Sequence, residues 1–433
     1  MLRGQLHALQ ESKLRQLLRH VLVASPFYQR HYGQHGIRLQ HVDGISIKDV
    51  PPVDKKLLMD NFDDVVCDRR LKRAAIDRFL LEPLVSGKQF LGEFTVVHTS
   101  GSTGAPGVFI YGPREVTTVA ALMMTRVRRF QLQPRRIRMM TVSAVEGRYA
   151  GVAVSQHAPG FLYASARCSV NLPLVEIAAR VQAFRPEILA GYPSVLAQLA
   201  GEQKAGRLRI APRTVITSGE PLTAAARQAL QEGFGLPPID LLASSESVVM
   251  GATCPGHEHL HLFEDFHIFE VSDADAGVVR SRDEGEQTLM TSLYNYTLPL
   301  IRYRMSDRYV LRDEPCPCGC AMTAIKQVAG RSEEYLWFDK RSGEREFIHP
   351  ISFVELYAPG LERTRIVQKS RTEFIIEVQG QGHDEIERVL KKQIGIVLDT
   401  KGLAESVRFS VSFRDHIPPL SKAGKHQLVV PIH

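Results

Sequence analysis

The most constraining feature of this chain is a short segment rich in serine, threonine and glycine that follows a run of β-branched residues. Residues 94–97 read Phe-Thr-Val-Val, and residues 100–105 hold three hydroxyl side chains and two glycines. Glycine lets backbone N–H groups curl around an anion, and serine and threonine hydroxyls add donors on the same side. The segment lacks the Gly-Lys-Ser/Thr ending of a Walker loop. It predicts a phosphate-binding loop, with an ordinary Ser/Gly turn as the alternative.

Length and composition favour a large globular protein. The chain has 433 residues, of which 44% are hydrophobic, enough for two or three domains. No apolar run approaches the length of about 18 residues that a transmembrane helix needs. Residues 1–7 have no apolar signal core, so we expect a cytoplasmic protein without a membrane partner.

The charge and the cysteine content narrow the class further. A net charge of +7 arises from 54 basic and 47 acidic residues. Because there is no long basic tail, this mild excess favours an anionic small substrate or an acidic carrier protein over nucleic acid. The six cysteines are unevenly spaced, which is not the pattern of a disulfide framework.

Alternating strand and helix patterns predict an α/β fold with two domains. Residues 214–217 resemble a buried strand, residues 223–234 a helix capped by Thr223 and ended by Gly235, and residues 239–242 the next strand. We expect a large N-terminal domain of mixed sheets and helices over residues 1–330, and a small α+β C-terminal domain over residues 331–433, with a hinge near Arg331. The expected C-terminal elements are strands at 364–367, 374–378 and 407–413 and a helix over 384–396.

Six short motifs occur in a fixed order along the chain. They are Thr-Ser-Gly-Ser-Thr-Gly at 99–104, Ser-Gly-Glu-Pro-Leu at 218–222, Ser-Glu at 245–246, Arg-Tyr-Arg-Met-Ser-Asp at 302–307, Gly-Arg-Ser-Glu at 330–333 and Gly-Lys at 424–425. Together these motifs resemble those of the adenylate-forming superfamily (acyl-CoA synthetases, nonribosomal adenylation domains and luciferases), and within it the phenylacetate–coenzyme A ligase-like branch.

The resemblance implies an enzyme that uses ATP and Mg²⁺ to activate a carboxylic acid as an acyl adenylate and then transfers the acyl group to a thiol. It assigns Mg²⁺ to Glu246, the ribose to Asp307, a hinge role to Arg331 with Glu333 at its pivot, and catalysis to Lys425. Glu246 and Arg331 join Lys425 in the expected catalytic set. The implied nucleotide-binding residues are Thr99, Ser100, Gly101, Ser102, Thr103, Gly104, Ser218, Gly219, Glu220, Pro221, Ser245 and Asp307.

The chemistry of these residue types agrees with such a reaction. When a carboxylate attacks the α-phosphate of ATP, the site must neutralise charge on the phosphate oxygens and on the departing pyrophosphate. Glu246 offers the hard oxygen ligands that Mg²⁺ prefers, and Lys425 offers a point charge that a hinged domain can bring in or remove. Considered alone, Glu246 could be a solvated carboxylate, Asp307 a turn cap and Lys425 a surface lysine, and Lys422 competes with Lys425 for the same role.

Several positions depart from the family pattern. Leu242 stands where an aromatic residue would stack on adenine, and Gly107 where a lysine often follows the loop. Met305 and Ser306 replace threonine and glycine. Residues 336–343 differ from the glycine-containing loop that helps to form a coenzyme A channel, which leaves the acceptor open between coenzyme A, the phosphopantetheine of an acyl carrier protein, an amine and none.

By resemblance the acid is aromatic, and its pocket is expected from residues 142–152 and 190–194, with Arg148 as a candidate partner for a carboxylate or ring substituent. A homodimer is also compatible with the sequence. Two other functions stay open. One is a nucleotidyl transferase that places AMP on a cofactor hydroxyl, and the other is a noncatalytic, nucleic-acid-binding relative with a decayed site.

Two clusters of cysteine and histidine residues favour a structural zinc site. Residues 254–261 read Cys-Pro-Gly-His-Glu-His-Leu-His, and residues 316–320 read Cys-Pro-Cys-Gly-Cys. Zinc takes four such ligands in a tetrahedron, so one ion would hold the two segments together. Free buried thiols beside a histidine-rich turn are the alternative. The expected ligands are Cys254, His261, Cys316 and Cys318, with His257, His259 and Cys320 as competitors.

Overall fold

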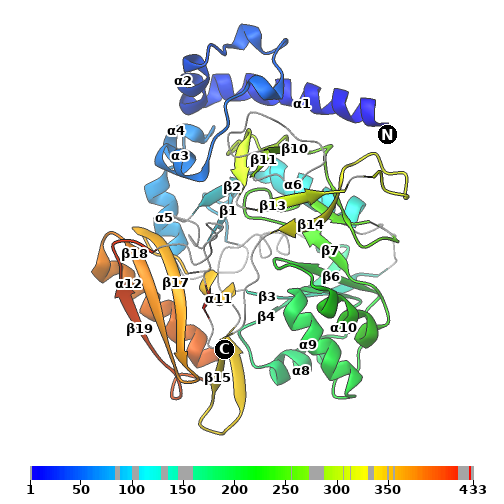
Figure 1. The fold of residues 1–433 in the computed structure, drawn as a ribbon, viewed down its shortest axis with the longest axis vertical. Coiled ribbons are helices and arrows are strands. Elements are labelled where there is room, and N and C mark those ends of the chain that lie inside the picture. Colours follow the sequence, from blue (N-terminus) through cyan, green and yellow to red (C-terminus); the bar gives the residue numbers. More distant parts are fainter. Residues whose placement is uncertain are drawn as a thin grey trace.

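The computed structural model describes residues 2–82, 88–99, 107–127, 135–144, 159–254, 256–272, 287–305, 307–312, 314–329, 336–348, 351–354, 356–417 and 429–430. Several predicted site residues lie outside these ranges, namely residues 100–104, Arg148, Arg331, Lys422 and Lys425. The expected fold class is confirmed: the molecule combines a large α/β part with a smaller α+β part (Figure 1).

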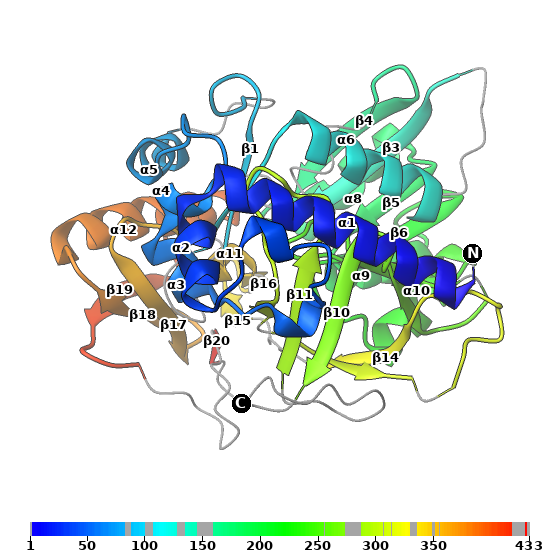
Figure 2. The same ribbon diagram turned by 90° about the horizontal axis from the view of Figure 1, so that it is seen from above.

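The chain begins with helices that lie across the large part (Figure 2). The first helix buries Leu14, Leu17 and Val21 along one stripe, as the helical spacing of these residues predicts. Ser25 starts the second helix by accepting the N–H of Tyr28. The helices are α1 (Arg3–Ala24), α2 (Pro26–Gln34), α3 (Lys55–Asp60), α4 (Phe62–Val65) and α5 (Arg73–Leu81), with 3₁₀ turns at Leu39–His41 and Ile47–Asp49.

A nine-stranded mixed sheet forms the centre of the large part. From β4 to β7 the neighbouring strands run parallel, and the remaining neighbours run antiparallel. Because parallel strands end at the same edge, the loops after β4, β3, β5, β6 and β7 meet there, which is where open α/β sheets bind ligands. In spatial order the strands are β13 (Arg308–Leu311), β14 (Ala324–Ala329), β9 (Leu260–Leu262), β8 (Gly251–Thr253), β7 (Ile239–Leu242), β6 (Thr214–Ser218), β5 (Ile188–Gly191), β3 (Ile137–Ser143) and β4 (Tyr163–Ser169).

Three helices cover the parallel half of this sheet: α8 (Leu174–Phe184), α9 (Pro193–Lys204) and α10 (Ala224–Phe234). The helix expected over residues 223–234 is confirmed. Thr223 accepts the N–H of Ala226, and Gly235 ends the helix with a φ of 73°, which a residue with a Cβ rarely adopts.

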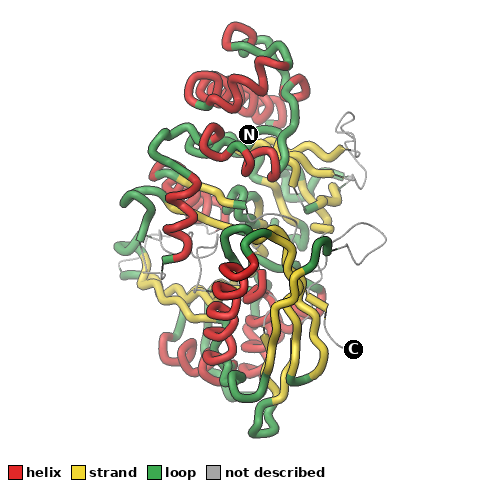
Figure 3. Tube along the Cα trace, turned by 90° about the vertical axis from the view of Figure 1, so that its left-hand side faces the viewer, coloured by secondary structure: helices red, strands yellow, loops and turns green. Residues whose placement is uncertain are grey.

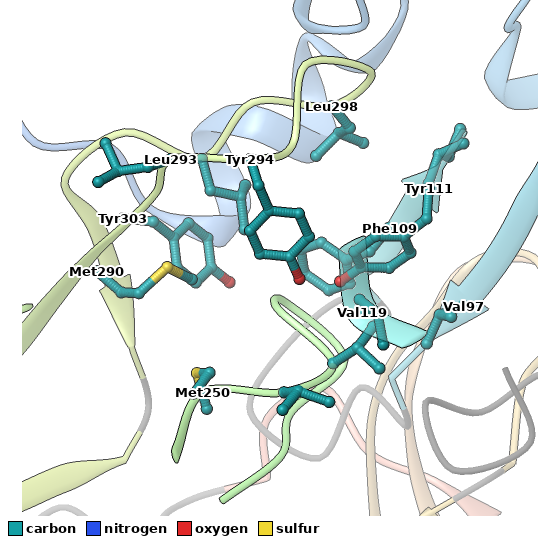
Figure 4. Packing of buried hydrophobic residues seen from close by; sticks show 14 of the residues in the cluster. Val97, Phe109, Tyr111, Val119, Met250, Met290, Leu293, Tyr294, Leu298 and Tyr303 are labelled. Carbon is teal, nitrogen blue, oxygen red and sulfur yellow. The ribbon is translucent and has the colours of Figure 1, made fainter. Parts of the chain in front are cut away.

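Two smaller sheets share an apolar core with the N-terminal helices. Figure 4 shows Tyr294 and Tyr303 between the aromatic side chains of Phe109 and Tyr111 and the apolar side chain of Met290. This core fixes the hairpin on which the predicted phosphate loop begins. Its elements are β1 (Thr95–His98), β2 (Val108–Tyr111), α6 (Pro113–Leu122), a π-helical turn (Met123–Val127), β10 (His267–Ser272), β11 (Gln287–Ser292) and β12 (Tyr303–Met305).

The described residues from 336 onward, here called the C-terminal segment, have a core of their own. A four-stranded sheet in the order β19-β18-β17-β20 packs against one long helix (Figure 3), and the strands and helix expected from the sequence are confirmed. The division at residue 331 stays a prediction. The elements are β15 (Leu336–Asp339), β16 (Arg345–Ile348), α11 (Ile351–Val354), β17 (Leu361–Ser370), β18 (Glu373–Gly380), α12 (His383–Thr400), β19 (Arg408–Phe413) and β20 (Val429–Val430).

A buried ion pair joins the motif at residues 302–307 to the rest of the large part. The Arg302 guanidinium donates to both oxygens of Glu270 at 3.0 Å, and each side chain is 6% exposed. A third nitrogen donates to the carbonyl oxygens of Lys48 and Val50 at 3.1 and 2.8 Å. Arg302 adopts a φ of 48°, an uncommon value for a residue with a side chain. These bonds hold the strand that leads toward Asp307.

Among the residues that the structure describes, every helix is too short or too polar to cross a lipid bilayer.

Replacing Arg302 by methionine should strongly destabilise the protein, because the Glu270 carboxylate would stay buried without its partner. We expect a loss of about 3–5 kcal/mol of unfolding free energy, measured by urea denaturation. The control is Arg30→Met, which removes an exposed ion pair with Asp64 and should cost less than about 1 kcal/mol. Equal losses in the two variants would contradict a structural role specific to Arg302.

Candidate functional site

The base of the predicted phosphate loop is closed by Thr99 and Gly107. The Thr99 N–H donates to the Gly107 carbonyl at 2.9 Å, and the Gly107 N–H donates to the Thr99 hydroxyl oxygen at 2.8 Å. A Cβ at position 107 would lie 2.8 Å from the Phe109 ring, so any other residue here would require that ring to shift. The loop between them, residues 100–106, lies outside the described residues.

The predicted adenine turn follows β6 at the carboxyl edge of the sheet. Gly219 has a φ of 84°, and a Cβ there would lie 2.8 Å from a ring carbon of Tyr192, so conformation and space both require glycine. The Glu220 carboxylate accepts the N–H of Ser194 at 3.3 Å, in the first turn of α9. A carboxylate is stabilised near the N-terminus of a helix. Ser218, Gly219, Glu220 and Pro221 therefore form a turn at the carboxyl end of β6 that is held against Tyr192 and Ser194.

Asp240 lies beside this turn and was not found by sequence analysis. It pairs in register with Thr217, whose hydroxyl donates to its carboxylate at 2.9 Å. Burial raises the pKa of Asp240 to about 6, against the smaller lowering effects of the Thr217 hydrogen bond and the Arg227 charge. A carboxylate here offers an acceptor next to the place proposed for a nucleotide base.

Glu246 occupies the loop after β7, at the same edge of the sheet. Its neighbour Ser245 accepts a hydrogen bond at its carbonyl oxygen from the Tyr111 hydroxyl, at 2.7 Å. The Tyr303 hydroxyl is hydrogen-bonded to the Glu246 carboxylate. Burial raises the pKa of Glu246, the negative charge of Asp307 raises it further, and the positive charge of Lys55 on α3 opposes both effects.

Two carboxylates, Glu246 and Asp307, are thus close enough to repel each other. Asp307 is partly exposed, and it precedes β13 by one residue. Their oxygens are the hard ligands that Mg²⁺ prefers, and a divalent cation would relieve the repulsion. The residues present therefore fit a magnesium ion, and the roles predicted for Glu246 and Asp307 stay predictions.

The predicted zinc ligands come together although they are far apart in sequence. Cys254, His261, Cys316 and Cys318 each place a ligand atom within 4.8 Å of the others. The pairing of β9 with β14, in which His261 lies opposite Ala324, explains this, because Cys254 and His261 belong to the β8–β9 hairpin and Cys316 and Cys318 precede β14. The Cys254 and Cys316 sulfurs are 3.5 Å apart, and the Cys318 sulfur lies 3.3 Å from Nε2 of His261. Sulfur and imidazole nitrogen in this arrangement fit a tetrahedral zinc ion.

The competing ligands differ in their distance from this group. The Nε2 atom of His259 lies 2.9 Å from the Cys316 sulfur, so His259 is a close competitor. His257 stacks on the His259 ring with centroids 5.3 Å apart. Nδ1 of His261 lies 3.1 Å from the carbonyl oxygen of Met322, an arrangement that orients metal-bound imidazoles.

The segments expected to line an acid pocket, residues 142–152 and 190–194, lie next to each other in the part that the structure describes. A Cβ at Gly191 would lie 2.4 Å from the carbonyl oxygen of Val142, because β3 and β5 pair there. The Tyr192 hydroxyl accepts the N–H of Ala144 at 3.4 Å. Arg148 and residues 145–152 fall outside the described residues. Leu242 is 8% exposed and lies in the main core.

Sequence analysis gave no role to Lys55, Tyr111 or Asp240, which lie around the predicted nucleotide and magnesium residues. It named Tyr303 only within a motif and Tyr192 only within the expected acid pocket. Tyr303 and Asp240 stood within or beside recognised motifs, so a search for polar side chains at strand ends would have found them. Lys55 and Tyr111 reach the site from distant elements and carry no local signal.

Comparison with known proteins adds the following findings. No protein-family model matches the chain. It is 26% identical over 347 residues to the phenylacetate–coenzyme A ligase of Thermus thermophilus, covering 77% of this chain and 72% of that protein. The corresponding Escherichia coli enzyme is 22% identical over 345 residues, with the same coverage of 77% and 72%. A solved structure of 2-hydroxyisobutyryl-CoA ligase with 2-HIB-AMP and CoA superposes with a TM-score of 0.62 at 19% identity, over 99% of this chain and 90% of that one.

The fold is therefore that of the adenylate-forming ligases. In sequence the chain is similar to the phenylacetate–coenzyme A ligases, in agreement with the resemblance that the order of its motifs indicated.

The raised pKa of Asp240 predicts a pH-dependent stability difference. An aspartate whose pKa is raised from 3.8 to about 6 on folding contributes its stability below pH 4 and loses it as the pH rises through 6. Asp240→Asn, which stays neutral, should therefore gain about 1–3 kcal/mol relative to the native protein at pH 8, and little at pH 4.

Urea denaturation at both pH values measures this difference, and Asp43→Asn, at an exposed carboxyl, is the control. A gain for Asp240→Asn that is the same at pH 4 and pH 8 would contradict the burial of a charged carboxylate beside the turn.

Proposed function

We propose that this protein activates a carboxylic acid with ATP as an acyl adenylate and then transfers the acyl group to coenzyme A. The observation that carries the proposal is the half-buried Glu246 carboxylate beside Asp307, at the sheet edge that also bears the Ser218–Glu220 turn. Two crowded carboxylates next to a braced, glycine-containing turn suit a nucleotide with its cation. The sequence matches to phenylacetate–coenzyme A ligases support the same reaction.

In the first half-reaction a carboxylate oxygen of the acid bonds to the α-phosphorus of ATP, and the bond to pyrophosphate breaks. We assign the adenine to the turn at residues 218–221 and the ribose hydroxyls to Asp307, whose two oxygens can accept both. Magnesium, held by Glu246, would supply charge neutralisation at the phosphates. Lys425 and the hydroxyls of residues 99–104 would stabilise the negative charge that develops there.

In the second half-reaction the thiol sulfur bonds to the acyl carbon, AMP departs, and the thiol loses its proton. The Tyr303 hydroxyl, bonded to Glu246, holds that carboxylate in place during both steps. We assign residues 331–433 to a lid that rotates about Arg331 and Glu333 between the steps, and an aromatic acid to the pocket near residues 142–144 and 190–194. A carrier-protein phosphopantetheine presents the same thiol and is the alternative acceptor.

ATP–pyrophosphate exchange with a panel of aryl, cinnamoyl and fatty acids tests the first half-reaction, with a no-acid control. We expect exchange with aryl acids and, when coenzyme A is added, an aryl thioester. Lys425→Ala should lower exchange by about 100-fold or more, and Lys422→Ala, three residues away, should leave it nearly unchanged. The reverse order would assign the catalytic role to Lys422.

Two outcomes would overturn the proposal. Exchange with none of the acids is the first. A stable ester of AMP with a cofactor hydroxyl is the second, and it would identify a nucleotidyl transferase.

We also propose a structural zinc ion at Cys254, His261, Cys316 and Cys318, supported by the distances among the four ligand atoms. Magnesium would serve the chemistry, so the zinc ion would have a structural role. It would join the loop between β8 and β9 to the loop between β13 and β14. Zinc bound to folded protein contributes its binding energy to stability.

Replacing Cys316 and Cys318 together by serine should remove most of the zinc and lower the melting temperature. Native mass spectrometry or metal analysis measures the first effect, and thermal denaturation the second. Cys320→Ser, which changes an exposed cysteine in the same five residues, is the matched control and should keep its zinc. Full zinc content in the double variant would refute this ligand set.

A further inference from the structure

A buried lysine of the C-terminal segment has no role in the chemistry described above. Lys401 follows α12, and its side chain is 0% exposed. The ammonium donates to the carbonyl oxygens of Val170 and Leu172, both at 3.1 Å, and lies 3.5 Å from a carboxylate oxygen of Glu346. It also lies 4.5 Å from the centroid of the Phe347 ring.

These contacts cross between two parts of the molecule that have separate cores. Val170 and Leu172 follow β4 of the large sheet, whereas Lys401 and Glu346 belong to the C-terminal segment. The Phe347 side chain, 3% exposed, belongs to the core formed by β3, β5, β6 and their helices. The Ser352 hydroxyl donates to the Asn171 side-chain oxygen at 2.6 Å, and this bond is buried. We call these residues the docking patch: Val170, Asn171, Leu172, Glu346, Phe347, Ser352 and Lys401.

The charge of Lys401 makes the docking patch selective for one arrangement. A buried ammonium is costly unless its donors are satisfied, and here carbonyl oxygens from one part and a carboxylate from the other satisfy it together. The Glu346 carboxylate also forms an ion pair with Lys340 at 3.2 Å, so its negative charge is compensated by two lysines. If the C-terminal segment moved by a few ångströms, Lys401 would keep its contact with Glu346 but lose the carbonyl oxygens of Val170 and Leu172. The contact is therefore either fully formed, which we call seated, or broken, which we call released.

The docking patch lies at the functional edge of the sheet. Residues 170–172 follow β4 at its carboxyl end, the edge that carries the adenine turn after β6 and Glu246 after β7. A second contact reaches the other flank. The Tyr357 hydroxyl donates to Asp77 at 2.5 Å, and its ring lies 5.3 Å from the ring of His98, which directly precedes the phosphate loop. The C-terminal segment thus touches both flanks of the candidate site.

We infer that Lys401 is the positioning residue that seats the C-terminal segment over the candidate site, and that release of Lys401 from the carbonyls of Val170 and Leu172 accompanies its opening. Lys401 touches no substrate in this scheme and acts through the position of the segment. The link between opening and the reaction rests on the proposed function, whereas the seating itself does not.

The chain provides its own reporter of seating. It contains one tryptophan, Trp337 on β15, which is 38% exposed and has its ring 5.3 Å from that of Phe347. Acrylamide quenching of its fluorescence therefore reports on the docking patch without any substrate. Lys401→Met keeps an unbranched apolar chain and removes the charge. Lys392→Met, on the exposed face of α12, is the matched control.

We expect the acrylamide quenching constant of Trp337 to rise by about twofold or more in Lys401→Met, because local release exposes the β15–β16 hairpin. In Lys392→Met the constant should stay at the native value. Asn171→Ala, which weakens the same patch from the large part, should produce a smaller rise in the same direction. Circular dichroism confirms that each variant is folded. Unchanged quenching in both Lys401→Met and Asn171→Ala would overturn the inference.

Comparison of the two half-reactions links seating to function. In Lys401→Met the ratio of thioester formation to pyrophosphate exchange should change by about threefold or more relative to Lys392→Met. A ratio equal in the two variants would overturn the functional part of the inference. If the native protein shows no exchange with any acid, the proposed function fails, and the quenching result still decides whether Lys401 seats the segment.

Discussion

The buried pair of Arg302 and Glu270 is the interaction on which the candidate site most depends. It ties the start of β12 to β10 and, through the carbonyls of Lys48 and Val50, to the N-terminal region. The next residue, Tyr303, then presents its hydroxyl to Glu246. Replacing both members of a buried ion pair with apolar residues often costs little stability. We therefore interpret this pair as fixing the position of β12 relative to β10 rather than as a large source of stability. That arrangement brings the carboxylates of two separate motifs together.

The sequence predicted the parts of the site that depend on strand order. Ser218 ends β6 and Glu246 follows β7, and these two strands are parallel neighbours in the sheet, so the proximity of the two residues follows from topology. The cysteine and histidine clusters met for a similar reason, since they lie in or beside β9 and β14, which pair. Local patterns also gave the helix from Thr223 and the elements of the C-terminal segment, because capping residues and apolar periodicity specify such elements locally.

The sequence could not reveal contacts between elements that are distant in the chain. Lys55 acts on Glu246 from a short N-terminal helix, and Tyr192 fills the space beside Gly219 from the turn before α9. Neither residue differs locally from an ordinary surface lysine or core tyrosine. The burial of Lys401 could not be predicted either, because a lysine at the end of an amphipathic helix is normally exposed. Its burial is decided by the carbonyls of another part of the molecule.

The charges at the site connect these contacts to the chemistry. Glu246 and Asp307 repel each other in a poorly solvated place, so adding the phosphates of a nucleotide requires cations. A magnesium ion would supply part of this charge, and Lys425 would supply a further part from the C-terminal portion of the chain. Lys401 belongs to that same portion and is seated on backbone carbonyls at the edge of the site. The position of the C-terminal segment at this edge thus depends in part on one desolvated ammonium, whose partners come from both parts of the molecule.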